Sequence, residues 1–166
     1  SVANDTFGES VTKGSNWVLD VYNKYVFGEQ FYTILGVNYI KDEAIFADEV
    51  DFTIVDPYAN MVYVSDFGFN LNAGARLNNH SEYGNHFVYN VNPSYVFDTE
   101  NGYVKLMGSY ATSYITPNLT QLFGAFGGNP ALEPEENSTI EGGIEFKLNN
   151  SFRISTVYFD RNETNT

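Results

Sequence analysis

The sequence predicts an all-β fold, the wall of an antiparallel transmembrane β-barrel, with about eight strands present. Apolar and polar residues alternate along most of the chain, which is the period of a strand with two different faces. The alternating segments mostly run about 11–13 residues, compared with ~5–6 in globular proteins and the ~9–11 that cross a bilayer. Short turns and long loops alternate between the segments, as they do in membrane barrels.

The predicted strands follow this alternation in chain order. They are 16–27, 31–41, 59–65, 67–78, 86–97, 102–114, 138–148 and 151–161. In the clearest strand, Phe69 and Leu71 fall on one face, whereas Asn70 and Asn72 fall on the other. The basic residues within strands share the more polar register: Lys24, Arg76, Lys105 and Lys147. Because a Lys or Arg on a lipid face costs about 2–4 kcal/mol near the bilayer centre, we expect the apolar face to meet lipid.

Turn residues and strand ends predict the connections. Short turns are expected at 28–29, 66, 98–101 and 149–150, and long loops at 42–58, 78–86 and 115–137. Aromatic residues gather beside the short turns, where a ring can lie partly in lipid and partly in water. These residues are Tyr25, Phe27, Phe31, Tyr95, Phe97 and Tyr103. They predict one interfacial girdle of a barrel.

The loop 115–137 is expected to have a defined shape of its own. Pro117, Pro130 and Pro134 have no amide hydrogen to give a sheet, and Gly124 and Gly127 allow backbone angles that other residues avoid. Several apolar residues in the same stretch argue against disorder. They are Leu119, Leu122, Phe123, Phe126 and Leu132. A long ordered loop in an otherwise tight β-protein is usually functional.

Composition excludes several classes of protein. The net charge of −13 makes nucleic acid a poor partner, because phosphate binding needs Lys and Arg patches. The chain has no cysteine, hence no disulfide framework and no thiolate chemistry. No nucleophile elbow, phosphate-binding loop or zinc-protease motif is present, so we do not expect an enzyme. The sequence has no run of 18 apolar residues, so it predicts no transmembrane helix.

The stretch from Ser109 to Phe146 carries a family resemblance. It reads S-Y-x-T-S-Y, then P-N-L-x-Q-L-F-G, then G-N-P-x-L-x-P-E and a Glu-Gly pair at Glu141 and Gly142. In this order and spacing, the stretch resembles the late-barrel segment of TonB-dependent outer-membrane receptors, most closely the vitamin B12 (cobalamin) receptor branch. Weaker similarity extends upstream to Phe67, and the first ~60 residues match only as alternating strands.

The resemblance implies an interior segment of a large barrel of about 22 strands, with residues 1–166 forming one β-barrel segment that lacks the plug domain. It implies TonB-dependent uptake of a scarce nutrient at the bacterial outer membrane, with cobalamin the first expected ligand and ferric siderophore or haem next. The implied partners are outer-membrane lipid, the small-molecule nutrient, and the TonB complex through the missing plug region. Nothing at Ser1 reads as a signal peptide, and the polar residues 162–166 follow a strand, so we expect both ends to be cut.

Two other functions fit the same pattern. About eight strands is also the size of a small closed barrel, so the chain could be a self-contained eight-stranded outer-membrane barrel that acts as an adhesin or structural anchor. A soluble β-sandwich would also keep charge off its buried face, and would then be a binding module. We rank the receptor segment first, because the resemblance is to interior strands of a much larger barrel.

Candidate ligand-binding residues lie around the longest loop, since extracellular loops carry recognition by their position. They are Tyr114, Asn118, Phe123 and Phe126. For Phe123 and Phe126, packing of the loop against its neighbours is an equal alternative. Charged residues in the lumen register are expected to pair with one another or with a plug. These are Arg76, Lys105, Glu141 and Arg153.

No cofactor or metal is expected. The predicted loop 42–58 carries several carboxylates, Asp42, Glu43, Asp48, Glu49, Asp51 and Asp56. Calcium ordering this acidic loop is the alternative to a simply solvated loop, although no calcium-binding loop motif is present. His80, Glu82 and His86 could bind a transition metal, but their spacing matches no ligand motif, so surface polar residues are the preferred interpretation.

Overall fold

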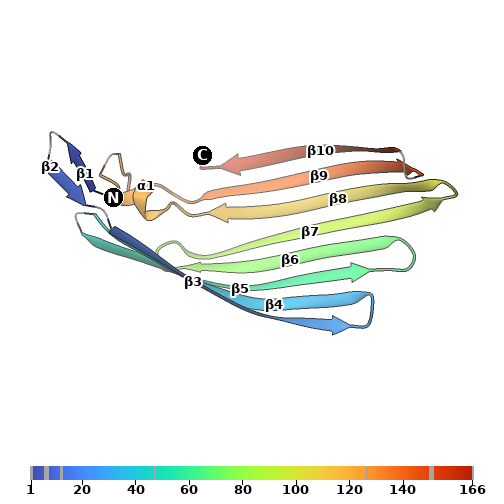
Figure 1. Ribbon diagram of the computed structural model, residues 1–166, viewed down its shortest axis with the longest axis horizontal. Coiled ribbons are helices and arrows are strands. Elements are labelled where there is room, and N and C mark those ends of the chain that lie inside the picture. Colours follow the sequence, from blue (N-terminus) through green and yellow to red (C-terminus); the bar gives the residue numbers. More distant parts are fainter. Residues whose placement is uncertain are drawn as a thin grey trace.

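Eight long strands form one antiparallel sheet in strict chain order (Figure 1). The computed structural model describes residues 2–5, 8–11, 13–46, 48–125, 127–149 and 152–165. The sheet consists of β3 (Lys13–Phe27), β4 (Phe31–Ile45), β5 (Glu49–Val64), β6 (Phe69–His80), β7 (Gly84–Thr99), β8 (Gly102–Ile115), β9 (Glu135–Leu148) and β10 (Phe152–Thr164). A separate hairpin joins β1 (Val2–Asp5) to β2 (Gly8–Val11), and α1 (Leu119–Phe123) lies between β8 and β9. No helix in the described part of the chain is long and apolar enough to cross a membrane.

All eight predicted strands are confirmed, and most are longer than predicted. The largest correction concerns the expected loop 42–58, which is mostly strand: β4 runs to Ile45 and β5 begins at Glu49. The expected loop 78–86 is likewise reduced to residues 81–83 between β6 and β7. The third long loop, between β8 and β9, is confirmed. The two ends of the sheet therefore differ mainly by that single long loop (Figure 1).

Pro57 explains why the sequence suggested a loop where β5 runs. Proline cannot donate to a ladder. The pairing of β5 with β6 skips from Val55 to Tyr58, while the pairing with β4 continues through Pro57. The Asn78 amide bridges the gap by donating to the Asp56 carboxylate at 3.1 Å. Side-chain hydrogen bonds thus replace the missing ladder bond and let a proline remain inside a long strand.

The short turns at Gly28 and Asn149 follow the predicted chemistry. The turns that join β3 to β4, β5 to β6 and β7 to β8 lie together at one end of the sheet, and α1 lies at the other end (Figure 1). Gly28 has φ of +71° and Asn149 has φ of +51°, the left-handed values that glycine and asparagine tolerate best. Asn150, the second residue of the predicted last turn, lies outside the described residues.

The strand register divides the sheet into an apolar face and a polar face. Directly paired residues share a face, and the pairs Trp17–Lys41, Leu35–Ala59 and similar pairs carry one register across all eight strands. The apolar face includes Trp17, Leu19, Val21, Leu35, Val37, Leu71, Ala73, Val91, Tyr110, Ile144 and Ile154. The polar face carries Asp20, Lys24, Asn38, Asn60, Asn72, Arg76, Asn90, Lys105, Glu141, Glu145, Lys147 and Arg153.

This register confirms that Lys24, Arg76, Lys105 and Lys147 share the polar face. The apolar side chains opposite them are open to the outside. Trp17 is 69% exposed and Tyr158 is 73% exposed. A face this apolar and this exposed needs a covering, and lipid supplies one for a transmembrane barrel.

Aromatic residues bound the apolar face at both ends. Phe27 and Phe31 lie at the short-turn end, as predicted, with ring centroids 5.5 Å apart. Tyr63 and Phe69, which were not predicted for the girdle, lie at the same end. Trp17, Tyr39 and Phe87 lie toward the opposite end. A strand rises about 3.3 Å per residue and tilts roughly 40° in a barrel, so the distance from Trp17 to Phe27 along a barrel axis would be about 25 Å.

Tyr103 is a correction to the predicted girdle. It lies on the polar face, where its hydroxyl donates to the Glu145 carboxylate at 2.5 Å and the Lys147 ammonium lies 5.7 Å from its ring centroid. Tyr103 and Val104 are consecutive residues of β8, so their side chains point to opposite faces, and it is Val104 that lies on the apolar face. Nearness to a short turn therefore did not determine which face the ring would occupy.

The sheet is open along both long edges. In the described part of the chain, β10 pairs only with β9 and β3 pairs only with β4. A closed eight-stranded barrel would pair β10 with β3, so the self-contained barrel is not the arrangement observed. Unpaired strand edges are not tolerated in lipid, so within a membrane both edges of this sheet would have to pair with further strands.

Candidate functional site

The candidate site is the loop end of the polar face, where the loop 116–134 folds over the sheet. Its helix α1 begins with a capping box at Asn118. The Asn118 side chain accepts from the Gln121 amide at 2.9 Å, and the Gln121 side chain accepts from the Asn118 amide at 2.9 Å. Such reciprocal bonds satisfy two amides that a helix start leaves unpaired. They explain why a helix of only five residues forms at this position.

The helix α1 is anchored on a distant part of the sheet. Leu119 and Leu122 are buried and form a cluster with Ala44 and Phe52. Partly buried Phe46 and Val50 pack against this cluster. The loop leaves from β8, whereas Ala44 and Phe52 belong to β4 and β5, with β6 and β7 lying between in the sheet order. The loop therefore reaches across the polar face and covers part of it.

Further bonds hold the returning half of the loop. The Asn129 amide donates to the Gln121 carbonyl at 2.9 Å, and the Gly128 amide donates to the Gly124 carbonyl at 3.0 Å. The Tyr83 hydroxyl, from the turn between β6 and β7, donates to the Leu132 carbonyl at 3.4 Å. These contacts give the predicted defined shape a physical basis, because each uses a backbone group that the sheet cannot satisfy.

Two open hollows lie beside α1. One, of about 350 Å³, is lined by Phe46, Asp48, Val50, Leu122, Phe123, Gly124, Gly128 and Pro130. The other, of about 390 Å³, is lined by Gly14, Ser15, Asn16, Asp42, Glu43, Ala44, Asn118, Leu119 and Thr120. The first offers aromatic surface and one carboxylate, and the second offers hydroxyl, amide and carboxylate groups. Neither has a Lys or Arg in its lining.

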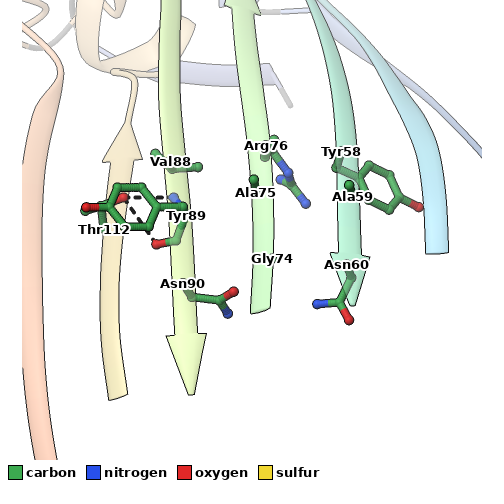
Figure 2. Close-up of a pocket in the computed structure, with 10 residues that line it drawn as sticks. All are labelled: Tyr58, Ala59, Asn60, Gly74, Ala75, Arg76, Val88, Tyr89, Asn90 and Thr112. Atoms are coloured by element: carbon green, nitrogen blue, oxygen red, sulfur yellow. Dashed lines mark hydrogen bonds between the residues drawn. The ribbon is translucent and has the colours of Figure 1, made fainter. Parts of the chain in front are cut away.

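A third hollow of about 300 Å³ lies nearer the middle of the polar face (Figure 2). Its polar lining residues include Tyr58, Asn60, Arg76 and Asn90, and Gly74 lies between Asn60 and Asn90. A Cβ at Gly74 would lie 2.7 Å from the Asn90 Oδ1, so a larger residue there would require the Asn90 side chain to shift. This Oδ1 is buried and has no hydrogen-bond partner among the described residues. The hollow thus presents amide groups and a guanidinium toward whatever fills the interior.

Two of the charged residues predicted to face the interior, Arg76 and Arg153, lie near carboxylates of the wall that are outside the predicted set. The Arg76 guanidinium lies 3.9 Å from the Asp56 carboxylate and 5.7 Å from the Tyr58 ring centroid. The Arg153 guanidinium lies 3.9 Å from the Glu145 carboxylate. Lys105 lies directly across from Glu145 in the ladder between β8 and β9. These contacts lower the cost of placing charged groups close together on the polar face.

Among the predicted ligand-binding residues, Asn118 caps the start of α1 and Phe123 ends it, and the two line different hollows. Phe123 is 37% exposed and lines the aromatic hollow, so its side chain is accessible from outside. The Asn118 side chain is engaged in the helix cap. Tyr114 stacks on His86 with centroids 4.0 Å apart, away from α1 at the end of β8. Phe126 lies outside the described residues. None of these observations tests binding, which stays a prediction for all four residues.

The acidic residues do not form the predicted loop. Asp42 and Glu43 lie on β4, and Asp51 and Asp56 lie on β5, because strand pairing extends past the apolar band. Glu43 accepts from Ser15 at 2.9 Å and pairs with Lys41; the pairing with Lys41 is the larger effect, and together they hold the pKa of the Glu43 carboxyl below its usual range. Within the described ranges, no group of three His, Cys, Asp or Glu side chains could hold a metal ion.

His80 is a second correction, because it is not a surface residue. It is 4% exposed and lies between the rings of Phe52 and Tyr83, with centroids 4.8 and 4.9 Å away. Its Nδ1 accepts from the Glu82 amide at 3.1 Å. Burial lowers the pKa of His80, although nearby carboxylates oppose that change. The alternation of β6 could have indicated this position, since His80 continues the register of Arg76 and Asn78 toward the polar face.

The fold and this site can now be compared with known proteins. A family model described as TonB dependent receptor-like, beta-barrel, matches residues 2–166. The chain is similar to the siderophore receptor PirA from Pseudomonas aeruginosa, with 20% identity and a TM-score of 0.80 over 96% of this chain. It is also similar to the ferric enterobactin receptor PfeA in complex with BCV-L6, with 19% identity and a TM-score of 0.73 over 96% of this chain.

At these identities the two structures show a shared fold. The chain spans 36% and 28% of the lengths of those two chains. Neither the family model nor these structures points to the cobalamin branch that the sequence suggested. The open edges, the apolar face and the loop over the polar face all suit a segment of a larger barrel wall. The family model covers nearly every residue, and the chain therefore belongs to the TonB-dependent receptor-like β-barrel family.

Proposed function

We propose that this chain forms part of the wall of a bacterial outer-membrane receptor that captures a scarce small-molecule nutrient and imports it with energy delivered through TonB. The observation that carries the proposal is the family match over residues 2–166. In such a receptor, the apolar face meets lipid and the polar face meets the barrel interior. The TonB complex would act through a plug region outside this segment.

The geometry supports capture at the loop end of the sheet. The loop 116–134 lies over the polar face, so in a barrel it narrows the mouth on the side of α1. Phe46 and Phe123 offer rigid aromatic area to a ligand that enters beside this helix. The amides and Arg76 of the central hollow lie deeper on the same face. A nutrient would thus meet aromatic groups first and polar groups next.

A ferric siderophore is our first proposal for the nutrient, and cobalamin is the second. The titles of both similar structures name siderophore or ferric enterobactin receptors, which favours this order. The cobalamin alternative has the sequence motif around Pro117 and Asn118 in its favour. The self-contained adhesin is not favoured for two reasons. The sheet is open, and the chain matches 36% of the length of the larger receptor PirA.

The experiment is a nutrient growth test with the full receptor that carries this segment. A host without its own uptake receptors would express the wild type, or a variant with residues 119–132 replaced by a short Gly-Ser linker. We expect the wild type to restore growth on a ferric siderophore at limiting iron, and the variant to lose this ability while still folding as a barrel. If only cobalamin supported growth, the proposed nutrient would be cobalamin and not a siderophore. No restoration by any nutrient, with a folded barrel in the membrane, would contradict the transport proposal.

A further inference from the structure

The buried side chain of His80 joins three parts of the loop end. It ends β6, its ring packs edge-on against Phe52 of β5, and it contacts Tyr83 of the following turn. Phe52 also lies in the cluster that seats Leu119 and Leu122 of α1. Tyr83 donates to the Leu132 carbonyl in the second half of the same loop. One imidazole therefore supports both anchors of the loop 116–134.

The hydrogen bonds of His80 require the neutral imidazole. Nδ1 accepts from the backbone amides of Glu82 at 3.1 Å and Tyr83 at 3.4 Å. Because Nδ1 accepts, the ring hydrogen of the neutral form is on Nε2. Nε2 is buried and has no partner within the described residues. A second proton would sit on Nδ1 and would face two amide hydrogens, so the turn 81–83 could not keep its present bonds.

We propose that His80 is a pH-sensitive latch: its neutral ring holds the turn 81–83 under the loop 116–134, and its protonation releases the turn and lifts the loop from β4 and β5. The proposal concerns the position of the loop. It stands whether or not the receptor transports a siderophore.

The burial of His80 and the charges around it determine the pH range in which this latch works. Carboxylates approach His80 from three elements, namely Glu82 of its own turn, Asp56 of β5 and Asp42 of β4, and each favours the protonated ring. The burial of His80 is the larger effect and lowers its pKa below the ordinary 6.5. The ring is then neutral in the folded loop at pH 7. In the open form of the loop, His80 has its ordinary pKa of 6.5, and in the closed form its pKa is lower. As the pH falls below 6.5, the open form binds the proton first, and the closed form loses stability relative to it until the pH reaches the lower pKa.

The segment contains no cysteine, which permits a direct accessibility test. Ala44 is 8% exposed and lies beneath α1, so a thiol at this position reports whether the loop is closed. Ala44→Cys would be introduced into the full receptor in detergent, with any cysteine outside this segment replaced by serine. Labelling by dithiodipyridine would be followed from pH 7.5 to 4.5. Its rate would be divided by that of a second receptor carrying Glu100→Cys, exposed in the turn at the opposite end.

We expect the normalised labelling of Ala44→Cys to rise about tenfold on acidification, because the loss of a buried hydrogen bond shifts a local opening equilibrium by about this factor. The midpoint should lie below pH 6.5. In a His80→Asn background the rise should disappear, because the asparagine oxygen can accept in place of Nδ1 and stays neutral. His80→Gln is the second variant if the first does not fold.

The matched control is His86→Asn, since His86 is the other histidine of the chain and stacks on Tyr114 instead of supporting the turn. This variant should keep the rise in labelling. An equal rise in the His80→Asn and His86→Asn backgrounds would overturn the proposal and assign the effect to carboxylates. A flat profile in the Ala44→Cys parent would overturn it as well. Siderophore-dependent growth at neutral pH is a separate measurement, so a failed latch and a failed transport assignment remain distinguishable.

Discussion

Tyr58 occupies the space directly above Gly36, where a Cβ would lie only 2.5 Å from the Cζ of the tyrosine ring. The two residues are cross-strand partners on β5 and β4. The ring reaches over the glycine to the next strand, where its hydroxyl donates to the Asp20 carboxylate at 3.1 Å. An aromatic ring thus covers backbone that glycine leaves bare and ties three strands of the polar face together.

Gly36→Ala should destabilise the barrel, although alanine is the better residue in a strand. The new methyl group would displace the Tyr58 ring, and overpacking of this kind typically costs about 1–3 kcal/mol. The measurement is the urea midpoint of the full receptor in detergent. Gly142→Ala is the matched control, because a Cβ at Gly142 meets nothing within 4 Å. Equal midpoints for the two variants would show that the Tyr58 ring yields without cost.

The assignment of the two faces predicts opposite outcomes for adjacent lysine substitutions. Ala73 is on the apolar face, paired with Met61 and Val91, whereas Asn72 is on the polar face, paired with Asn92. Ala73→Lys should lower folding stability in lipid by about 2–4 kcal/mol, because the charge would lie near the bilayer centre. Asn72→Lys should have a much smaller effect. The fraction of receptor that folds into lipid vesicles, read from the migration of unheated samples on a gel, measures this difference. If Asn72→Lys lowered the folded fraction more than Ala73→Lys did, the assignment of the lipid and lumen faces would be the wrong way round.

Substitutions at Asn118 separate its role in the helix cap from a role in ligand binding. Asn118→Ala should remove the cap and weaken α1 by about 0.5–2 kcal/mol, which faster amide hydrogen exchange in residues 119–123 would reveal. Asn118→Ser should retain the cap, since serine caps helices about as well as asparagine. If the nutrient contacts the Asn118 amide, then Asn118→Ser lowers affinity without loosening α1. Full affinity in Asn118→Ser would remove this residue from the predicted ligand-binding set.

Asp56 is expected to matter for stability more than an ordinary carboxylate of this chain. It is 3% exposed and accepts two hydrogen bonds from Asn78 at the interruption that Pro57 makes in the ladder. Asp56→Ala should cost about 1–3 kcal/mol, because the Asn78 amide loses its acceptor and Arg76 loses its partner. Asp98→Ala, exposed near a short turn, is the control and should change the urea midpoint little. Equal effects would mean that water replaces Asp56.

The class of fold, the eight long strands and the division of their residues between two faces could be predicted from the sequence, whereas the hairpin of β1 and β2 was not predicted. Alternation between Phe69 and Leu77 was enough to assign faces, because the period of a strand requires consecutive side chains to point in opposite directions. The same rule assigns Arg76 and Lys105 to the polar side, and the strand pairing agrees with it. The long loop was also predictable, because Pro117 and Pro130 exclude a ladder at those positions.

The extent of each strand and the contacts of the loop depend on tertiary packing and could not be predicted from the sequence. Pro57 and its acidic neighbours look like a loop locally, but pairing with β4 and the bond from Asn78 to Asp56 keep them in β5. The burial of His80 and the packing of Leu122 on Phe52 join residues that are distant in sequence. Local alternation holds no information about such contacts, because they depend on where the loop lands after the whole sheet has formed.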